Sequence, residues 1–216
     1  MKNKHTHYIY ASFALLLFVA LGYMVKFYPE ALTGFDSNIQ TWVRGDLPAG
    51  LTAFFKMITT LGNTSVQAVI AILAVIWLYL RQYKAEAIFV GTSGVLASIM
   101  IMSLKYIYQR PRPSITHLVH AGGYSFPSGH SLGTFMILGA IAIVLTQRLV
   151  KKAAKTAVYG LTGLLIFLVG LSRIYVGVHY PTDVLAGFTL AFGLLNAIYP
   201  TYDRIRFEWR FQSKQK

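Results

Sequence analysis

The sequence has no cysteine and few charged residues, and these absences remove several classes of protein. Without cysteine, the 216-residue chain cannot form disulfide bonds, thiolate nucleophiles or cysteine-ligated zinc and iron–sulfur sites. Charged residues make up 12% of the chain, against about 25% in an average soluble domain. Hydrophobic residues reach 55%, so polar side chains are too few to cover a globule in water. Much of the surface is therefore predicted to face lipid.

Acidic residues are especially scarce, which leaves the chain strongly basic. Twenty lysine and arginine residues oppose seven aspartate and glutamate residues, giving a formal net charge of +13. In a soluble protein this excess would suggest binding to nucleic acid. In a membrane protein, lysine and arginine collect in cytoplasmic loops and set the orientation of the chain. Because of the apolar composition we expect the second explanation and no nucleic-acid partner.

Long apolar runs divide the chain into segments that could each cross a membrane, which takes about 20 residues. The first run has no charge before Lys26 and is longer than the apolar region of a cleaved signal peptide, so we interpret it as a span. Six spans are predicted, at about residues 8–27, 61–80, 85–106, 131–149, 157–172 and 184–199. The expected fold is all-α, a six-helix transmembrane bundle forming a single integral-membrane domain over residues 1–216.

The basic residues predict the orientation of this bundle. Thirteen of them fall on one side of the predicted membrane. They are Lys2, Lys4, Arg81, Lys84, Arg148, Lys151, Lys152, Lys155, Arg204, Arg206, Arg210, Lys214 and Lys216. By the positive-inside rule this side is cytoplasmic. Both termini are then inside the cell membrane, and the loops after the first, third and fifth spans face outward.

The first outward segment, about residues 29–60, is long enough to contain structure of its own. Its apolar residues recur at helical spacing, which predicts a short helix lying in the membrane interface. They are Leu32, Phe35, Ile39, Trp42 and Val43. Such a helix could guide lipid or cover a site, or it could simply connect two spans.

Polar residues gather in three outward clusters, at residues 105–113, 124–131 and 172–183. Charge beside a membrane is costly, so each cluster suggests a function. In the second, Pro127 could occupy the first position of a helix. The backbone N–H groups of Ser128, Gly129 and His130 would then lie at the positive end of the helix dipole and bind an anion such as phosphate. A capped helix start without function would have the same sequence.

The third cluster places His179 four residues before Asp183, which we expect in the first turn of a helix. The carboxylate could accept a hydrogen bond from one imidazole nitrogen and leave the other free as a base or nucleophile. An aspartate that only caps the helix is the alternative.

Three cations accompany these motifs: Lys105, Arg112 and Arg173. Arginine and lysine bind phosphate oxygens well. Each could instead extend to lipid headgroups, but that does not explain why all three lie beside the two histidine motifs. The outward acids that could neutralise them are few, namely Glu30, Asp36, Asp46 and Asp183.

Taken together, the clusters resemble the signature of the type 2 phosphatidic acid phosphatase superfamily. Its K-x6-R-P motif matches Lys105 to Pro113, its P-S-G-H motif matches residues 127–130, and its S-R-x5-H-x3-D motif matches residues 172–183. Every spacing agrees. The resemblance implies that His179 attacks phosphorus to form a phosphohistidine, that Asp183 orients it, and that His130 protonates the leaving oxygen and later activates water.

The resemblance also implies a set of phosphate-binding residues that stabilise the transition state. They are Lys105, Arg112, Ser128, Gly129 and Arg173. No metal ion and no cofactor are expected, and the few carboxylates agree with this, since they offer no oxygen-rich magnesium site. Arg110 has no place in the motifs and is interpreted as an auxiliary phosphate or headgroup contact. His117 and His120 are interpreted as single loop histidines, and His5 and His7 as part of the cytoplasmic tail.

The predicted function is removal of a terminal phosphate from a membrane lipid phosphate or pyrophosphate that enters from the bilayer. Phosphatidylglycerophosphate is favoured as substrate, with overlapping activity on undecaprenyl pyrophosphate. A lipid phosphotransferase would use the same residues and differ only in its acceptor. A non-enzymatic transporter would explain the spans but not the histidine motifs.

Overall fold

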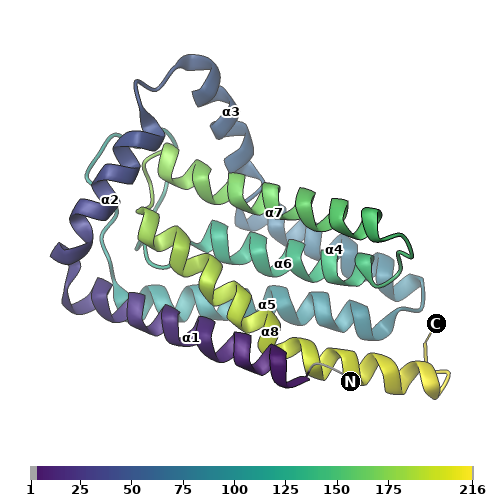
Figure 1. Ribbon diagram of the computed structural model, residues 1–216. Helices are drawn as coiled ribbons and strands as arrows, with labels where there is room; N and C mark the ends of the chain where they lie inside the picture. Colours follow the sequence, from purple (N-terminus) through teal and green to yellow (C-terminus); the bar gives the residue numbers. More distant parts are fainter. Residues whose placement is uncertain (1–3, 216) are drawn as a thin grey trace.

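The computed structural model describes residues 4–215, which fold into eight helices (Figure 1). They are α1 (Lys4–Phe27), α2 (Pro29–Arg44), α3 (Ala49–Thr60), α4 (Thr64–Leu80), α5 (Lys84–Tyr108), α6 (Gly129–Thr146), α7 (Lys152–Tyr175) and α8 (Pro181–Phe211). The predicted all-α fold is confirmed. Two of the basic residues assigned to the cytoplasmic side, Lys2 and Lys216, lie outside the described residues.

Five of the described helices, α1, α5, α6, α7 and α8, are each long and apolar enough to cross a membrane. The 17-residue α4 follows α3 after a short break at which the chain bends by 49°, and the two helices meet the same criterion together. By length and composition, residues 4–215 thus contain five candidate spans, or six if α3 and α4 form one span together, close to the predicted six. The predicted span at 61–80 corresponds to α4, and the last span is longer than predicted, since α8 continues through Pro200 to Phe211.

The segment between the first and second predicted spans holds two helices, α2 and α3, where one short helix was predicted. The helical spacing that suggested it belongs to α2. The second helix, α3, begins after Pro48 and leads to the short break that precedes α4. In Figure 1, α2 lies across one end of the bundle, on the same side as the loops that follow α5 and α7.

The helices pack through an interior of apolar and small side chains and leave large apolar side chains outside. α8 packs against α1 and α6, with Leu132, Met136 and Leu190 fully buried. On the outer surface Phe13, for example, is 69% exposed. Such a surface is expected where a helix bundle contacts lipid rather than water.

Gly187 allows α8 to approach the beginning of α6. A Cβ atom at this position would lie 3.0 Å from the Ser128 carbonyl oxygen and 3.0 Å from the Ser131 Cβ. Because Gly187 lies one turn after Asp183, the close approach brings the P-S-G-H motif and the His–Asp motif to the same place.

The opposite end of the bundle contains a buried carboxylate with several cationic partners. Glu86 is fully buried; its carboxylate accepts from Arg148 at 3.0 Å and Arg210 at 3.2 Å, and it forms an ion pair with Arg206 at 3.3 Å. Part of the basic charge assigned to membrane orientation therefore also holds α5, α8 and the start of the loop after α6 together.

We predict that Glu86→Gln destabilises the protein, because it removes the buried negative charge that Arg148, Arg206 and Arg210 share. Loss of one partner of a buried ion pair costs about 3–5 kcal/mol. Thermal unfolding in detergent should show a clearly lower melting temperature. Glu208→Gln is the matched control, since the Glu208 side chain is 53% exposed and lies 4.0 Å from Arg204. Equal melting temperatures for the two variants would contradict this prediction.

Candidate active site

The three polar clusters meet at the end of the bundle where α2 lies. Lys105 comes from the last turn of α5, and Arg112 from the loop after it. Arg173 lies in the last turn of α7, and His179 and Asp183 stand at the junction of α7 and α8. The Ser128 N–H donates to the Asp183 carbonyl oxygen at 3.0 Å, which joins the start of α6 to this group. All eight predicted site residues therefore gather in one place.

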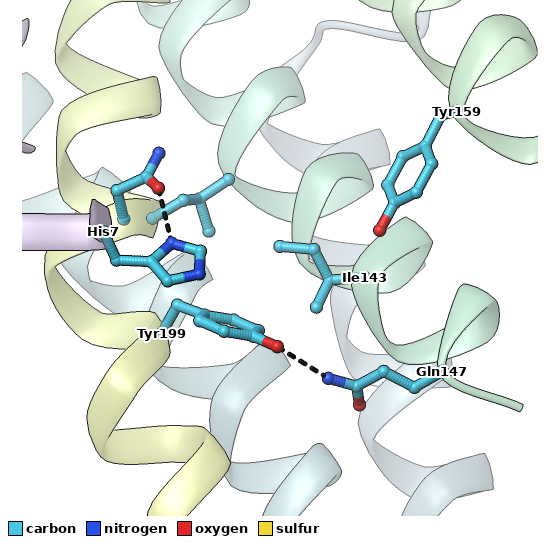
Figure 2. A pocket seen from close by; sticks show the side chains of 7 residues that line it. His7, Ile143, Gln147, Tyr159 and Tyr199 are labelled. Atoms are coloured by element: carbon cyan, nitrogen blue, oxygen red, sulfur yellow. Dashed lines mark hydrogen bonds between the residues drawn. The ribbon is translucent and has the colours of Figure 1, made fainter. Parts of the chain in front are cut away.

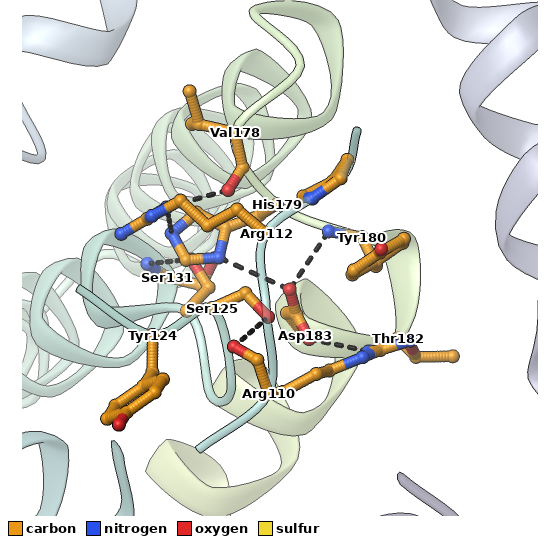
Figure 3. A network of polar contacts seen from close by, with 12 residues as sticks. Arg110, Arg112, Tyr124, Ser125, Ser131, Val178, His179, Tyr180, Thr182 and Asp183 are labelled. Carbon is orange, nitrogen blue, oxygen red and sulfur yellow. Dashed lines mark hydrogen bonds and ion pairs between the residues drawn. The ribbon is translucent and has the colours of Figure 1, made fainter. Parts of the chain in front are cut away.

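His179 and Asp183 form a buried pair (Figure 3). The Nδ1 atom of His179 lies 3.3 Å from Oδ2 of Asp183, and the two residues are 2% and 0% exposed. The Tyr180 backbone N–H donates to the same Oδ2 at 2.9 Å, as expected for an aspartate in the first turn of a helix. Asp183 thus both caps α8 and orients His179, so the two interpretations of the motif are compatible. With a proton on Nδ1, the Nε2 lone pair is free.

Arg112 lies beside this free nitrogen. Its Nη1 atom is 3.3 Å from His179 Nε2 and donates to the Val178 carbonyl oxygen at 2.6 Å. The other nitrogens donate to the carbonyl oxygens of Gly122 and Gly123 at 2.8 and 3.0 Å. Backbone carbonyls hold the guanidinium in position and leave its charge uncompensated.

Lys105 and Arg173 also have neutral partners. Lys105 Nζ donates to the Tyr124 carbonyl oxygen at 2.6 Å, and Arg173 Nη1 donates to the Thr59 hydroxyl at 2.5 Å. Arg173 is 3% exposed and its Nε atom is buried without a partner. In the described part of the chain, residues 4–215, no ion pair to a carboxylate includes Lys105, Arg112 or Arg173. One buried and two half-buried cations with only neutral partners favour binding of an anion.

The start of α6 differs in detail from the prediction. The helix begins at Gly129 with Ser128 as its N-cap, so Pro127 precedes the cap and is not the first helical residue. The Ser128 hydroxyl is buried and accepts from the Ser131 N–H at 3.3 Å and from the Ser131 hydroxyl at 2.9 Å. Of the three N–H groups expected to bind an anion, that of Ser128 instead donates to the Asp183 carbonyl oxygen. Those of Gly129 and His130 precede the first helical hydrogen bond and are available to an anion.

His130 has a partner that the sequence did not indicate. Its Nε2 atom lies 3.1 Å from Oδ1 of Asn63. Asn63 is the N-cap residue of α4, just after the bend that follows α3. Gly62 beside it leaves room for the His130 ring, which an added Cβ atom would meet. A Gly-Asn pair at a helix break could have suggested a turn, but nothing in the sequence connects it to residue 130.

Arg110 does not face the phosphate-binding group as the sequence suggested. Its guanidinium donates to the carboxylates of Asp183 at 2.6 Å and Asp36 at 2.7 Å. It is therefore a further arginine of the site end but, unlike Arg112 and Arg173, it has carboxylate partners.

Burial and positive charge keep His179 neutral. Its pKa lies well below the ordinary value, first because the ring is buried and then because of the charges of Arg173, Arg112 and Lys105. A neutral imidazole with a free Nε2 is a nucleophile.

A cavity of about 180 Å³ lies between α1, α6, α7 and α8 (Figure 2). His7 lines it, donates from Nδ1 to Asn196 Oδ1 at 2.8 Å, and packs on the Tyr199 ring at 4.4 Å between centroids. His7 thus belongs to α1 and not to a tail. It is remote from the site, since Asn196 lies 13 residues after Asp183, about 20 Å along α8.

Metal binding finds little support in the described side chains. Within residues 4–215 no group of three or more histidine, aspartate or glutamate side chains could hold a metal ion. His117 Nε2 donates to the Pro113 carbonyl oxygen at 2.9 Å, and both His117 and His120 are exposed loop residues.

A buried His–Asp pair beside cations with neutral partners, in a bundle of apolar helices, is an arrangement suited to phosphoryl transfer at a membrane, and comparison with known families gives the particular family. The model of the PAP2 superfamily matches residues 85–207, more than half of the sequence. The chain belongs to the PAP2 superfamily.

Named relatives agree with this assignment. Phosphatidylglycerophosphatase B of Bacillus subtilis is 42% identical over 106 residues, covering 49% of each chain. Undecaprenyl-diphosphatase BcrC of the same organism is 34% identical over 126 residues, covering 56% of this chain and 60% of the relative. The chain thus matches about half to three fifths of the length of these relatives.

A solved structure has the same fold. The crystal structure of a transmembrane PAP2-type phosphatidylglycerolphosphate phosphatase from Bacillus subtilis superposes with a TM-score of 0.83. It is 27% identical and covers 90% of this chain and 96% of its own.

We predict that His179 stays neutral at pH 6.5, where an unperturbed histidine is half protonated. The sign follows from the lowered pKa, since the neutral form then persists as the pH falls through 6.5. Nitrogen-15 NMR of selectively labelled protein should show the neutral Nδ1–H tautomer to about one unit below that value. The His179→Gln protein identifies the resonance. A midpoint at or above 6.5 would contradict the prediction.

Proposed function

We propose that this protein hydrolyses the terminal phosphate of a membrane lipid phosphate or pyrophosphate through a phosphohistidine at His179. The observation that carries the proposal is the group of three cations with neutral partners around the free Nε2 of His179. These cations supply the charge stabilisation that phosphoryl transfer requires, and Asp183 supplies the orientation of the nucleophile. Ser128 and Gly129 contribute the start of α6 as a further phosphate contact.

In the first step, His179 Nε2 attacks phosphorus and the bond from phosphorus to the lipid oxygen breaks. His130 donates a proton to the leaving oxygen, which becomes the lipid alcohol or lipid monophosphate. The phosphate dianion next to His130 favours the protonated imidazole that this step needs. Positive charge that develops on His179 is stabilised by the Asp183 carboxylate.

In the second step, water attacks the phosphohistidine. His130 takes a proton from the water, the bond from nitrogen to phosphorus breaks, and inorganic phosphate leaves. A lipid phosphotransferase would follow the same course with a lipid hydroxyl in place of water. Detection of free phosphate with water as the only acceptor distinguishes the two.

Phosphatidylglycerophosphate is the substrate we favour, because both phosphatidylglycerophosphatase B and the phosphatase of the solved structure are named after it. Undecaprenyl pyrophosphate is the second candidate, because the second relative is an undecaprenyl-diphosphatase. Both carry a terminal phosphate on a membrane-anchored chain and present the same group to the cations. A transporter without enzymatic activity would give no reason for the His–Asp pair.

We further propose that the protein is a single domain of the cell membrane, with both termini in the cytoplasm and the site facing outward. The positive-inside distribution supports this orientation. The site lies at the end of the bundle opposite the Glu86 cluster, where several of the basic residues gather. The lipid bilayer and a lipid phosphate are the only partners this function requires.

We predict that purified protein releases phosphate from these two lipids and that His179→Ala lowers the rate by about 10³-fold or more. A panel with phosphatidylglycerophosphate, undecaprenyl pyrophosphate, undecaprenyl phosphate and phosphatidic acid ranks the substrates. Radiolabelled substrate and alkaline quenching should trap a phosphohistidine in the wild type and not in the variant. An active His179→Ala protein would overturn the mechanism.

Because protein cations supply the charge, we predict that EDTA leaves the rate unchanged. Phosphate release in chelator should equal that in magnesium within about twofold. Asp183→Asn should still lose most activity under both conditions, which shows that the assay responds. Loss of activity in EDTA that magnesium restores would contradict a mechanism without metal.

We predict that Asn63→Ala lowers the rate on a lipid phosphate on the order of tenfold, because His130 loses the group that holds its ring. The loss should be smaller with p-nitrophenyl phosphate, whose leaving oxygen needs no proton. Asn38→Ala is the control, since Asn38 is an exposed asparagine of α2. Equal losses with both substrates would exclude a role at the leaving oxygen.

A further inference from the structure

A carboxylate from outside the signature motifs lies buried behind the His–Asp pair. Asp36, in the middle of α2, is 2% exposed although α2 is a surface helix of the site end. Its Oδ1 atom accepts from the Thr182 N–H at 2.9 Å. Its Oδ2 atom accepts from the Thr182 hydroxyl at 2.8 Å and from Arg110 Nη2 at 2.7 Å. Both oxygens are therefore bound to groups adjacent to Asp183.

Arg110 connects this carboxylate to that of Asp183, which orients His179. Its Nη1 atom donates to Asp183 Oδ1 at 2.6 Å and to the Thr182 hydroxyl at 2.7 Å. Asp183 keeps its other oxygen, Oδ2, for His179. The Arg110 guanidinium also stacks on the Tyr180 ring, 4.0 Å from its centroid. Hydrogen bonds and the Tyr180 ring thus hold Arg110 in place, and its charge is shared between the carboxylates of Asp36 and Asp183.

The charges of this group matter for the reaction. Asp36, Arg110 and Asp183 together carry a net charge of −1, so a negative charge remains beside His179. Without Asp36, Arg110 would neutralise Asp183 and the net charge would be zero. His179 gains positive charge when it attacks phosphorus, and a neutral pair stabilises that charge less than a negative group does. Lys105, Arg112 and Arg173 lie nearby, and their positive charge disfavours a positive His179. The negative charge that remains on Asp36, Arg110 and Asp183 is therefore all the more important for stabilising it.

We propose that Asp36 is a positioning residue for phosphoryl transfer, which acts through Arg110 and Thr182 to keep Asp183 negatively charged and correctly oriented toward His179. The proposal rests on the function proposed above and adds a residue of the first outward segment to it. Asp36 does not touch the phosphate-binding group, so its effect should fall on the chemical step and not on substrate binding.

The test is the steady-state hydrolysis of a lipid phosphate by Asp36→Asn. An asparagine has the same size and can still accept from Thr182, but it carries no charge. We expect kcat to fall on the order of 10- to 100-fold, as for partners one hydrogen bond removed from a metal-bound histidine, while KM changes less than about threefold. Glu30→Gln removes a negative charge from an exposed position of the same helix and should keep wild-type kinetics.

A double variant separates charge balance from simple structural loss. Asp36→Asn with Arg110→Gln removes one negative and one positive charge, so the net charge returns to −1 on Asp183. We expect the double variant to recover several-fold in kcat over Asp36→Asn alone. If Asp36 were only structural, removal of its second partner would lower the activity further. A double variant equal to or slower than Asp36→Asn therefore overturns the proposal.

Folding and function are checked in the same series. Inorganic phosphate should raise the melting temperature of Asp36→Asn as much as that of the wild type, and an absent shift would overturn the proposal by showing a structural effect. Wild-type kcat in Asp36→Asn would also overturn it. These results leave the proposed function intact as long as the wild type releases phosphate and His179→Ala does not.

Discussion

The site depends on one electrostatic constraint, that three cations are held at the end of an apolar bundle by groups without charge. Backbone carbonyls position Lys105 and Arg112, and a threonine hydroxyl positions Arg173. Carboxylates in these places would neutralise the cations and weaken an anion site. The neutral partners satisfy the hydrogen bonds and leave the charge for the ligand. Burial and then the same charge lower the pKa of His179 and keep it unprotonated, so one arrangement suits both the proposed phosphate binding and the proposed nucleophile.

Four other arginines differ from this arrangement, because each has a carboxylate as partner. Arg110 lies between two carboxylates, and Arg148, Arg206 and Arg210 share Glu86. These acidic residues thus pair with arginines that hold helices together, whereas none pairs with Lys105, Arg112 or Arg173 in residues 4–215. The net charge of +13 therefore includes the arginines around Glu86 and three cations without a carboxylate partner there, which we propose bind phosphate.

Much of this was predictable because the signals are local in the sequence. Apolar runs gave the helices, and the spacing of His179 and Asp183 follows from a helix that begins between them. The partners that come from distant segments were not predictable in the same way. Arg110 and Asp36 are 74 residues apart, and Asn63 and His130 are 67 apart. No local pattern distinguishes a buried Asp36 from the exposed acid Glu30 on the same helix.

The segment between α1 and α4, residues 28–63, is therefore more than a simple connector. It contributes Asp36 behind Asp183, Thr59 to Arg173, and Asn63 to His130. Through these three contacts the segment reaches the surroundings of Asp183, the Arg173 guanidinium, and His130, the proposed general acid. They require α2 to lie across the end of the bundle and the chain to bend between α3 and α4. The signature motifs supply the reacting groups, and this segment fixes their geometry, which is why its helices are part of the site although none of its residues belongs to a motif.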